Sequence, residues 1–290
     1  MMCKVLKVST SGYYKWRNKK KSKTEERRED LMADIIKIFH ENMQVYGSPR
    51  INKELIKTGK VVSQKTVARY MNELGLNAVV PKHYTVTTDS NHQRPIYPNL
   101  LNRQFTAEKP NQVWVADITY IWTNSGWVYL ASVMDLFSRK IIGWNIGTKL
   151  TKELAIVALE RALTFRTPSE GMIHHSDRGS QYASNEYTGI LKDNNIEISM
   201  SRKGDCYDNA CIESFHATIK KELIYRTKFK VQEEAKLAVW NYISGFYNEK
   251  RSHSTLGYIS PNQFENRYKE QLRESAHLFP ATFEDKQLAL

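Results

Sequence analysis

The spacing of apolar residues changes at Gln112 of this 290-residue chain, and the change constrains the fold more than any other sequence feature. Before Gln112, apolar residues recur every three to four positions, as on one face of a helix. After it, apolar and polar residues alternate in short runs bounded by turn residues, as in strands. Three such runs follow one another and are predicted to pair as an antiparallel meander: residues 113–122, 127–134 and 140–146.

Helices and strands then alternate through the second half of the chain. The expected elements are, in order, a helix capped by Thr151, a strand over 172–176, a short helix around Tyr187, a strand over 196–200 and helices over 208–225 and 232–247. Three strands followed by helix, strand, helix, strand and helix match an α/β fold of the ribonuclease-H-like class. The sequence therefore predicts such a domain over residues 111–270, with a C-terminal tail over 271–290.

The residues before Gln112 predict a separate, small all-α domain over residues 25–80. A turn at Tyr46–Arg50 leads into one short helix, and Ser63 is placed to cap the next, whose outer face carries Lys65 and Arg69. Helix, turn and helix with a basic outer face are typical of a helix-turn-helix that binds DNA. Small helical bundles without a DNA partner share the pattern, so it leaves both interpretations open.

Residues 81–110 are predicted to form an extended linker that lies over a domain surface. They hold four of the chain's eight prolines, set among Asn, Thr, Asp, Ser and Gln. Proline and small polar residues in such density interrupt both helices and strands.

The charge of the chain indicates a polyanionic partner. Lys and Arg number 43 against 31 for Asp and Glu, which gives a net charge of +12, and residues 1–23 alone hold eight basic residues and no acid. Residues 1–24 are therefore expected to form a basic arm that contacts nucleic acid, although a solvated arm has the same composition. No apolar run approaches the ~20 residues of a membrane span. Three cysteines without a CxxC pair fit a reducing cytoplasm.

Three acidic residues are candidates for a metal site. Asp117 lies in the middle of the first predicted strand, Asp177 ends the fourth, and Glu213 lies in the helix over 208–225. In the predicted fold these two strands are neighbours and the helix packs across their ends, so the three carboxylates would meet. Such a cluster repels itself unless divalent cations bind, and carboxylate oxygens suit Mg²⁺ or Mn²⁺.

The helical stripe of Glu213 also carries Lys220, which would reach a bound phosphate. A surface acid and a surface lysine on an amphipathic helix would look the same, so the helix alone does not decide. Three other acids are given structural roles. Asp135 is expected to close the turn between the second and third strands, Asp208 to cap the start of the helix, and Asp205 to lie in a mobile, glycine-containing loop.

Four segments in combination resemble the OrfB proteins of bacterial insertion sequences: residues 46–51, 114–120, 175–182 and 247–253. Asp117, Asp177 and Glu213, with residues 178–212 between the last two, are similar to the Asp-Asp-Glu triad of retroviral-integrase-type transposases. In that family a Lys or Arg follows the Glu by seven residues, and here that residue is Lys220.

The resemblance implies the catalytic subunit of a DNA transposase. It would be a metal-dependent polynucleotidyl transferase in which the three carboxylates hold two Mg²⁺ ions, with Mn²⁺ as a substitute. It would nick the ends of an insertion sequence and transfer the 3′-hydroxyl to another phosphate by transesterification. This chemistry does not require a histidine ligand, which leaves His174, His175 and His216 without an assigned role.

The resemblance also implies partners and a location. The partners are double-stranded DNA as element end and as target, further copies of the chain on that DNA, and an OrfA product, separate or fused, because this chain has no heptad run. The location is the bacterial cytoplasm, on the nucleoid. DNA contacts are expected from five basic residues: Arg50, Lys65, Arg69, Arg178 and Lys220.

Two alternative functions share most of these features. A non-catalytic or regulatory DNA-binding OrfB protein would have the same fold and charge. A plain ribonuclease-H-type nuclease would have the carboxylates, but the helical N-terminal domain and the position of Lys220 disfavour it.

Overall fold

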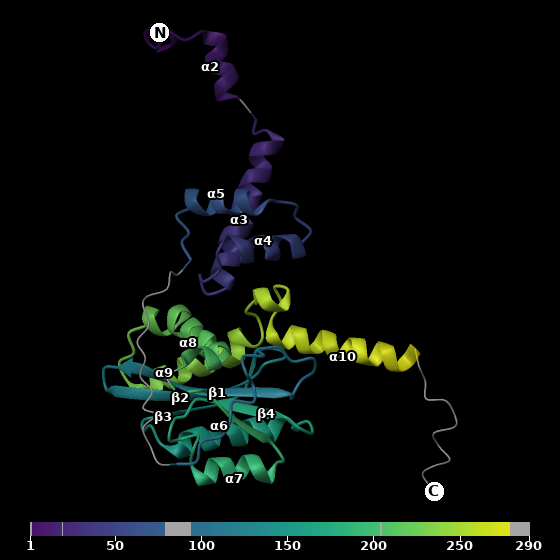
Figure 1. Cartoon of the computed structure of the whole chain (residues 1–290). Helices are drawn as coiled ribbons and strands as arrows, with labels where there is room; N and C mark the ends of the chain where they lie inside the picture. The colour runs from purple at the N-terminus through teal and green to yellow at the C-terminus, as the bar shows by residue number, and fades with distance from the viewer. Residues whose placement is uncertain (1, 19, 79–93, 204, 279–290) are drawn as a thin grey trace. The chain divides into compact units, whose positions relative to one another are not determined.

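The computed structural model describes residues 2–278 except 19, 79–93 and 204 (Figure 1). The chain divides into two compact units, Met1–Ala78 and Val79–Leu290, and each is described by itself. The part of the expected linker that spans 81–93 lies outside the described residues, as does the end of the tail from residue 279.

The first unit is entirely helical. Its helices are α1 (Met2–Val5), α2 (Thr10–Arg17), α3 (Lys23–Glu41), α4 (Ser48–Lys57) and α5 (Gln64–Glu73). Ser22 and Glu25 form a capping box at the start of α3, and the Ser63 hydroxyl accepts the backbone N–H of Thr66 at the start of α5, as its sequence position predicts. Residues 1–23, expected only as a basic arm, thus contain two short helices.

The helices α3, α4 and α5 pack around one small apolar core. Its centre is formed by side chains that are fully buried, one or two from each helix: Ile35, Ile51, Leu55 and Val67. Polar contacts close the bundle at its rim, where the Asn52 amide donates to the Val62 carbonyl at 2.8 Å and Arg28 pairs with Glu73 at 2.6 Å. The residues of α2 remain exposed or half-buried.

The second unit is built on a five-stranded mixed sheet with the order β3-β2-β1-β4-β5. The strands are β1 (Val113–Thr123), β2 (Gly126–Asp135), β3 (Lys140–Gly147), β4 (Ile173–Ser176) and β5 (Glu197–Met200). The first three form the predicted antiparallel meander, and β4 and β5 add to β1 in parallel. This is the ribonuclease-H-like arrangement that the sequence predicts.

Helices cover both faces of the sheet (Figure 1). One face holds α6 (Lys152–Phe165) and α7 (Asn185–Asp193); the other holds α8 (Ala210–Glu222) and α9 (Gln232–Trp240). The approach of α6 to β3 depends on Gly143, where a Cβ atom would lie 2.2 Å from the Ala158 carbonyl oxygen. Trp114 and Ala116 of β1 point into the core under α6 and α7. Successive strand residues alternate between faces, so Asp117 points to the side of α8.

A buried ion pair fixes the far end of α8. The Glu222 carboxylate accepts two bonds from Arg251, at 2.8 and 2.7 Å, and one from the Tyr242 hydroxyl at 2.7 Å. Burial opposes a charge on Arg251, yet its bonds to Glu222 keep the pKa of the guanidinium above its ordinary value. The helix that carries Glu213 is thus tied to the C-terminal part of the chain.

The helices after β5 differ from the prediction in three ways. The segment 208–225 is a 3₁₀ turn (Cys206–Asn209), then α8, then a second 3₁₀ turn (Ile224–Arg226). The expected helix over 232–247 is α only to Trp240 and continues as a π-helix over Asn241–Tyr247. An unpredicted helix, α10 (Pro261–Leu278), extends into the expected tail. Its apolar residues Phe264, Tyr268 and Leu272 recur every four positions. Phe264 and Tyr268 pack against Phe137, with ring centroids 5.1 and 4.8 Å away, and Glu265 is buried and paired with Arg166 at 2.6 Å.

The described part of the linker, residues 94–110, lies on the second unit. The backbone N–H groups of Leu100 and Leu101 donate to the Ser199 hydroxyl of β5 at 2.9 and 3.2 Å. Among the described residues, no helix is both long and apolar enough to cross a membrane.

Candidate active site

Asp117 is the central residue of the candidate site. It lies in β1 opposite Ser132 of β2, and its side chain is 16% exposed. One carboxylate oxygen, Oδ1, accepts the backbone N–H of Ile118 at 2.8 Å. The other, Oδ2, lies 3.1 Å from Nδ1 of His216 on α8, and Nε2 of that ring lies 3.3 Å from the Ser132 hydroxyl. His216 therefore links α8 to both strands of the hairpin.

Asp177 is placed beside Asp117 by strand pairing. Ala116 of β1 is in register with Ser176 of β4, so the next residue of each strand is one of the two aspartates. Because the strands are parallel and in register, both carboxylates lie side by side at the carboxyl end of β4. The Asp177 Oδ1 atom accepts the Gly179 N–H at 2.9 Å, and a Cβ atom on Gly179 would lie as close to that oxygen. Glycine thus permits this tight turn.

Tyr182 lies close to both aspartates. Burial raises the pKa of its phenol well above its ordinary value, and the charges of Asp117 and Asp177 raise it further. The hydroxyl is buried and has no hydrogen-bond partner among the residues that the structure describes. A buried hydroxyl without a partner is unusual in a folded protein and marks a place where a ligand atom can bind.

Glu213 and Lys220 both face Asp117 from α8. Burial raises the pKa of the Glu213 carboxyl to about 7, and the charge of Asp117 adds to the shift. Burial lowers the pKa of the Lys220 ammonium, whereas Asp117 opposes that change. Glu213 and Lys220 are seven residues apart on α8 and therefore lie on one stripe of the helix, next to the buried face of Ile212 and Phe215.

Carboxylate oxygens are the ligands that a hard divalent cation prefers, although the three candidate carboxylates do not converge on one point. Among the described residues, no three His, Cys, Asp or Glu side chains lie close enough together to hold a metal ion. Burial is the main cause of the raised pKa of Glu213, and the charge of Asp117 adds to it. Carboxylate oxygens beside a hydroxyl without a partner are donors that suit Mg²⁺ or Mn²⁺.

Comparison with known proteins assigns the family. Residues 26–84 match an HTH-like domain, and residues 107–206 and 194–261 match models of an integrase core domain. Over 268 residues the chain is 42% identical to the transposase InsF for insertion sequence IS3A of Escherichia coli (strain K12), with 92% of this chain and 93% of that protein covered. The chain belongs to this family of insertion-sequence transposases.

A second relative agrees with this assignment. The chain is 43% identical to the insertion element IS600 uncharacterized 31 kDa protein of Shigella sonnei, of which it covers 98%. Among solved structures, the magnesium complex of the HTLV-2 integrase catalytic core domain aligns with a TM-score of 0.41 and 18% identity, over 55% of this chain and 98% of that one. The protein is an OrfB-type DNA transposase with an integrase core, and nothing in these comparisons favours a non-catalytic role.

Asp208 of the transposase is not the helix cap that its position predicted. The residue at the cap position of α8 is Asn209, and no side chain caps this helix; Asp205 instead caps the 3₁₀ turn by accepting the Tyr207 N–H at 3.1 Å. Asp208 is fully buried and accepts bonds from three residues: Asn99, Arg103 and Arg202. The arginine contacts, above all that with Arg202, hold the pKa of this carboxyl far below its ordinary value.

The three histidines near the site have different roles. His174 and His175 are buried in β4, where His174 bonds to the Tyr187 hydroxyl at 3.0 Å and His175 lies between two serine hydroxyls. Burial lowers their pKa values, to about 3 and about 4. They are neutral core residues. His216 contacts Asp117, a role that the sequence analysis left unassigned because the expected chemistry does not require a histidine ligand.

The expected DNA-binding residues are divided between the units. Lys65 and Arg69 are exposed on α5, with the Arg69 guanidinium 5.2 Å from the centre of the Tyr70 ring, and Arg50 lies over the Tyr46 ring at 5.5 Å. Arg178 is half-buried in the second unit and donates from Nε to the Ser201 carbonyl at 2.6 Å. Part of its hydrogen-bonding capacity therefore supports the loop after β4.

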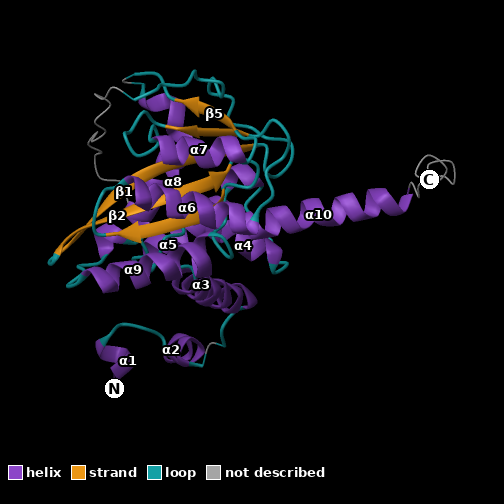
Figure 2. Ribbon diagram, turned by 90° about the horizontal axis from the view of Figure 1, so that it is seen from below, coloured by secondary structure: helices purple, strands orange, loops and turns teal. Residues whose placement is uncertain are grey.

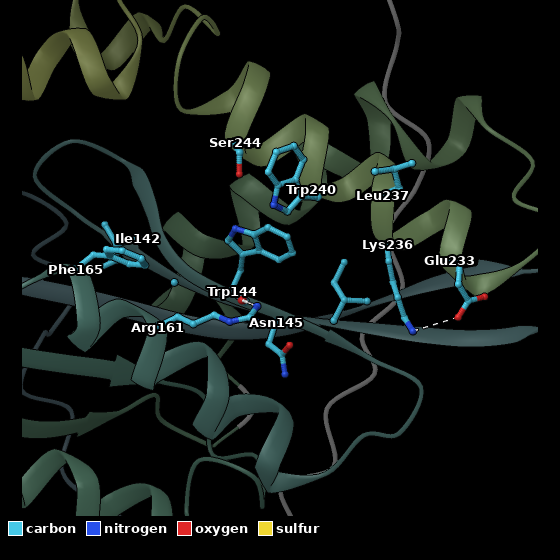
Figure 3. Close-up of a pocket in the computed structure, with 12 residues that line it drawn as sticks. Ile142, Trp144, Asn145, Arg161, Phe165, Glu233, Lys236, Leu237, Trp240 and Ser244 are labelled. Atoms are coloured by element: carbon cyan, nitrogen blue, oxygen red, sulfur yellow. Dashed lines mark hydrogen bonds and ion pairs between the residues drawn. The ribbon is translucent and has the colours of Figure 1, made fainter.

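A groove of about 780 Å³ lies elsewhere on the integrase core, along the edge strand β3 (Figure 3). Trp144 of β3 and Trp240 of α9 face each other across it, with Leu237 and Phe165 at its rim. None of the three candidate carboxylates lines this groove. This surface is therefore separate from the candidate carboxylates.

Proposed function

We propose that Asp117, Asp177 and Glu213 are the catalytic carboxylates of this transposase and hold two Mg²⁺ ions, or Mn²⁺ in their place. The observation that carries the proposal is the position of Asp117. It lies in register beside the strand end that bears Asp177, and its charge adds to the effect of burial in raising the pKa of Glu213. Two acids from separate parts of the sequence thus lie near Asp117.

The chain's own residues would prepare this site for DNA. His216, held by Ser132, donates from Nδ1 to Asp117 and orients its carboxylate, which makes it a positioning residue. Lys220 beside Asp117 is suited to bind a phosphate oxygen, and the Tyr182 hydroxyl can donate to a ligand oxygen. When bound, the cations would supply activation of the attacking hydroxyl and stabilisation of the departing 3′ oxygen.

The reaction would be nicking at the element's end followed by strand transfer. Water first cleaves the phosphodiester, and the resulting 3′-hydroxyl then attacks a target phosphate, so one phosphodiester bond forms as another breaks. Lys220 and Arg178 would bind phosphates near the carboxylates. Arg50, Lys65 and Arg69 would bind DNA through the helix-turn-helix of the first unit, and residues 1–23 would add contacts that do not depend on sequence.

The proposal extends to partners and place of action. The transposase would act as a homo-oligomer on double-stranded DNA, with an OrfA product, separate or fused, supplying recognition of the element's ends. Its place of action would be the bacterial nucleoid in the cytoplasm, where the DNA substrate is found.

Calorimetric titration with Mn²⁺ tests the carboxylate assignment without any catalytic readout. A metal must bind ionised carboxylates, so binding near pH 7 should release a proton from Glu213, whose pKa is about 7. We expect Glu213→Gln to weaken Mn²⁺ affinity at least about tenfold and to abolish that proton release. Glu160→Gln, at an exposed site on α6, is the matched control and should behave as wild type. Equal affinity and equal proton release in wild type and Glu213→Gln would overturn the assignment.

A further inference from the structure

The tip of the β1–β2 hairpin carries an unusual pair of exposed aromatic residues. Trp122 and Trp127 face each other across the hairpin, with ring centroids 4.9 Å apart and planes at 71°. Their side chains are 55% and 49% exposed. In Figure 2 the hairpin reaches past the helices that cover the sheet. Exposed large apolar residues are common one at a time, whereas an adjacent pair of tryptophans marks a binding surface.

A basic segment is fastened to this tip. The backbone N–H of Asn124 donates to the Phe229 carbonyl at 3.0 Å, and the Gln232 amide reaches the Trp127 carbonyl at 3.4 Å. Phe229 is buried and anchors the segment. Four neighbours of Phe229 are exposed: Tyr225, Arg226, Lys228 and Lys230. Residues 223–232 include no acid. We call the four exposed residues together with Trp122 and Trp127 the tip surface.

The tip surface lies at the ends of β1 and α8, the two elements that carry Asp117 and Glu213. Trp122 follows Asp117 by five residues on β1, a distance of about 17 Å at the rise of an extended strand. Tyr225 follows Lys220 by five residues, just beyond the end of α8. Asp117 and Trp122 point to opposite faces of the sheet. A DNA strand that left the carboxylates along α8 would meet the basic segment first and would then pass around the hairpin tip to the tryptophans.

We propose that the tip surface binds unpaired bases of a DNA strand that extends from the active site. Indole and phenol rings stack on base faces, and these faces are covered in a duplex but free in a single strand. Arg226, Lys228 and Lys230 supply the charge that a phosphate backbone needs, which favours DNA over an apolar protein partner. The proposal rests on the DNA substrate of the family and is independent of which carboxylates hold metal.

Fluorescence anisotropy with labelled DNA in excess EDTA tests this without cleavage. The probes are a blunt duplex and the same duplex with a single-stranded tail of a few nucleotides. We expect wild type to prefer the tailed probe and Trp122→Leu to lose about tenfold in affinity for it, with the blunt probe unaffected. Trp122→Phe keeps an aromatic ring at this position, with an apolar area close to that of leucine. It should keep most of the preference for the tailed probe. Lys228→Gln should lower the salt dependence of tailed-probe binding by about 0.7.

Trp240→Ala is the matched control, because Trp240 is 54% exposed but lies on α9 in the groove beside β3. It should leave the preference for the tailed probe unchanged. Melting curves and sedimentation of each variant show whether folding or self-association has changed. Equal tailed-to-blunt ratios for wild type, Trp122→Leu and Trp122→Phe would overturn the proposal. The proposal would also be overturned if Trp122→Leu kept the wild-type preference for the tailed probe but lost self-association. The tip surface would then be an interface between protein chains.

Discussion

His175 shows how a single buried side chain makes this fold sensitive to acid. It is fully buried between the hydroxyls of Ser199 and Ser201, at 2.8 and 3.1 Å, and burial lowers its pKa to about 4. The unfolded chain has the ordinary pKa of about 6.5. Between these values the unfolded state binds the proton and the folded state does not. The contribution of His175 to stability is therefore complete above pH 6.5 and is lost as the pH falls toward 4.

We predict that urea unfolding of wild type at a series of pH values loses stability between pH 6.5 and 4 more steeply than that of His175→Gln. The difference should be about 1.4 kcal/mol per pH unit, because the variant has no proton to bind at this position. His174 stays in place in both proteins; burial is the main cause of its lowered pKa and His175 a lesser one, so most of its contribution cancels in the comparison. Parallel curves for the two proteins would show that His175 is not buried in its neutral form.

At the scale of elements, the buried carboxylate of Asp208 joins the segment before β1 to the start of α8. Arg103 and Asn99, on the segment before β1, both bond to it at 2.9 Å, and Arg202 bonds to it from the loop after β5. The 3₁₀ turn that carries Asp208 leads directly into α8. This cluster lies next to the start of α8, and Asp208 precedes Glu213 by five residues.

Asp208→Asn is expected to destabilise the second unit by about 2 kcal/mol, because a neutral amide replaces the fully buried, ionised acceptor of Asn99, Arg103 and Arg202. Asp193→Asn, at an exposed position near the end of α7, should change stability little. Urea unfolding of both variants measures this. If Asp208→Asn were as stable as wild type, the carboxylate would be no more than the helix cap that its position suggests.

The sequence predicts the sheet well for a physical reason. Helices cover both faces of the sheet, so β1 and β2 are largely buried and their sequences are almost continuous apolar runs bounded by turn residues. Asp117 is conspicuous in such a run, because a carboxylate in a mostly buried strand requires a partner. Pairing of β1 with β4 then places Asp177 beside it, as the predicted strand order implies.

Long-range polar contacts leave no such local record. Asp208 precedes a helix and has the sequence context of a cap, but its partner Arg103 lies more than a hundred residues away. The helix α10 is missed although Phe264, Tyr268 and Leu272 recur at helical spacing, and the residues that it packs against, Phe137 and Arg166, are remote in sequence. The role of His216 is likewise visible only in the structure, through its contacts with Asp117 and Ser132. These residues become visible once the strands and helices are assembled.

At the scale of the whole molecule, the two units are expected to divide the work between binding and chemistry. Lys65 and Arg69 are exposed on α5 of the first unit, and the candidate carboxylates belong to the second. We predict that Lys65→Ala with Arg69→Ala weakens binding to DNA that carries the element's ends. Each lost phosphate contact should lower the salt dependence by about 0.9. Cleavage of short substrates at saturating concentration should be retained.

A matched control for this prediction is Lys37→Ala, which removes an exposed charge from α3 of the same unit. It should leave affinity for the element's ends close to the wild-type value. Gel-shift titrations give the affinities, and a nicking assay on the short substrate gives the rates. If binding and saturated cleavage fell equally in the double variant, the assignment of α5 to DNA binding alone would be wrong.

The central claim is that metal-dependent cleavage depends on the carboxylates around Asp117, and the most direct measurement is the nicking rate of Glu213→Gln in saturating Mn²⁺. The variant keeps the size of the side chain and removes the charge that would hold a cation. We predict that nicking falls by several orders of magnitude while the melting temperature and DNA affinity stay at wild-type values, and that excess EDTA abolishes nicking by wild type. A Glu213→Gln protein that nicks within a few-fold of the wild-type rate, or a wild type that nicks in EDTA, would contradict the claim.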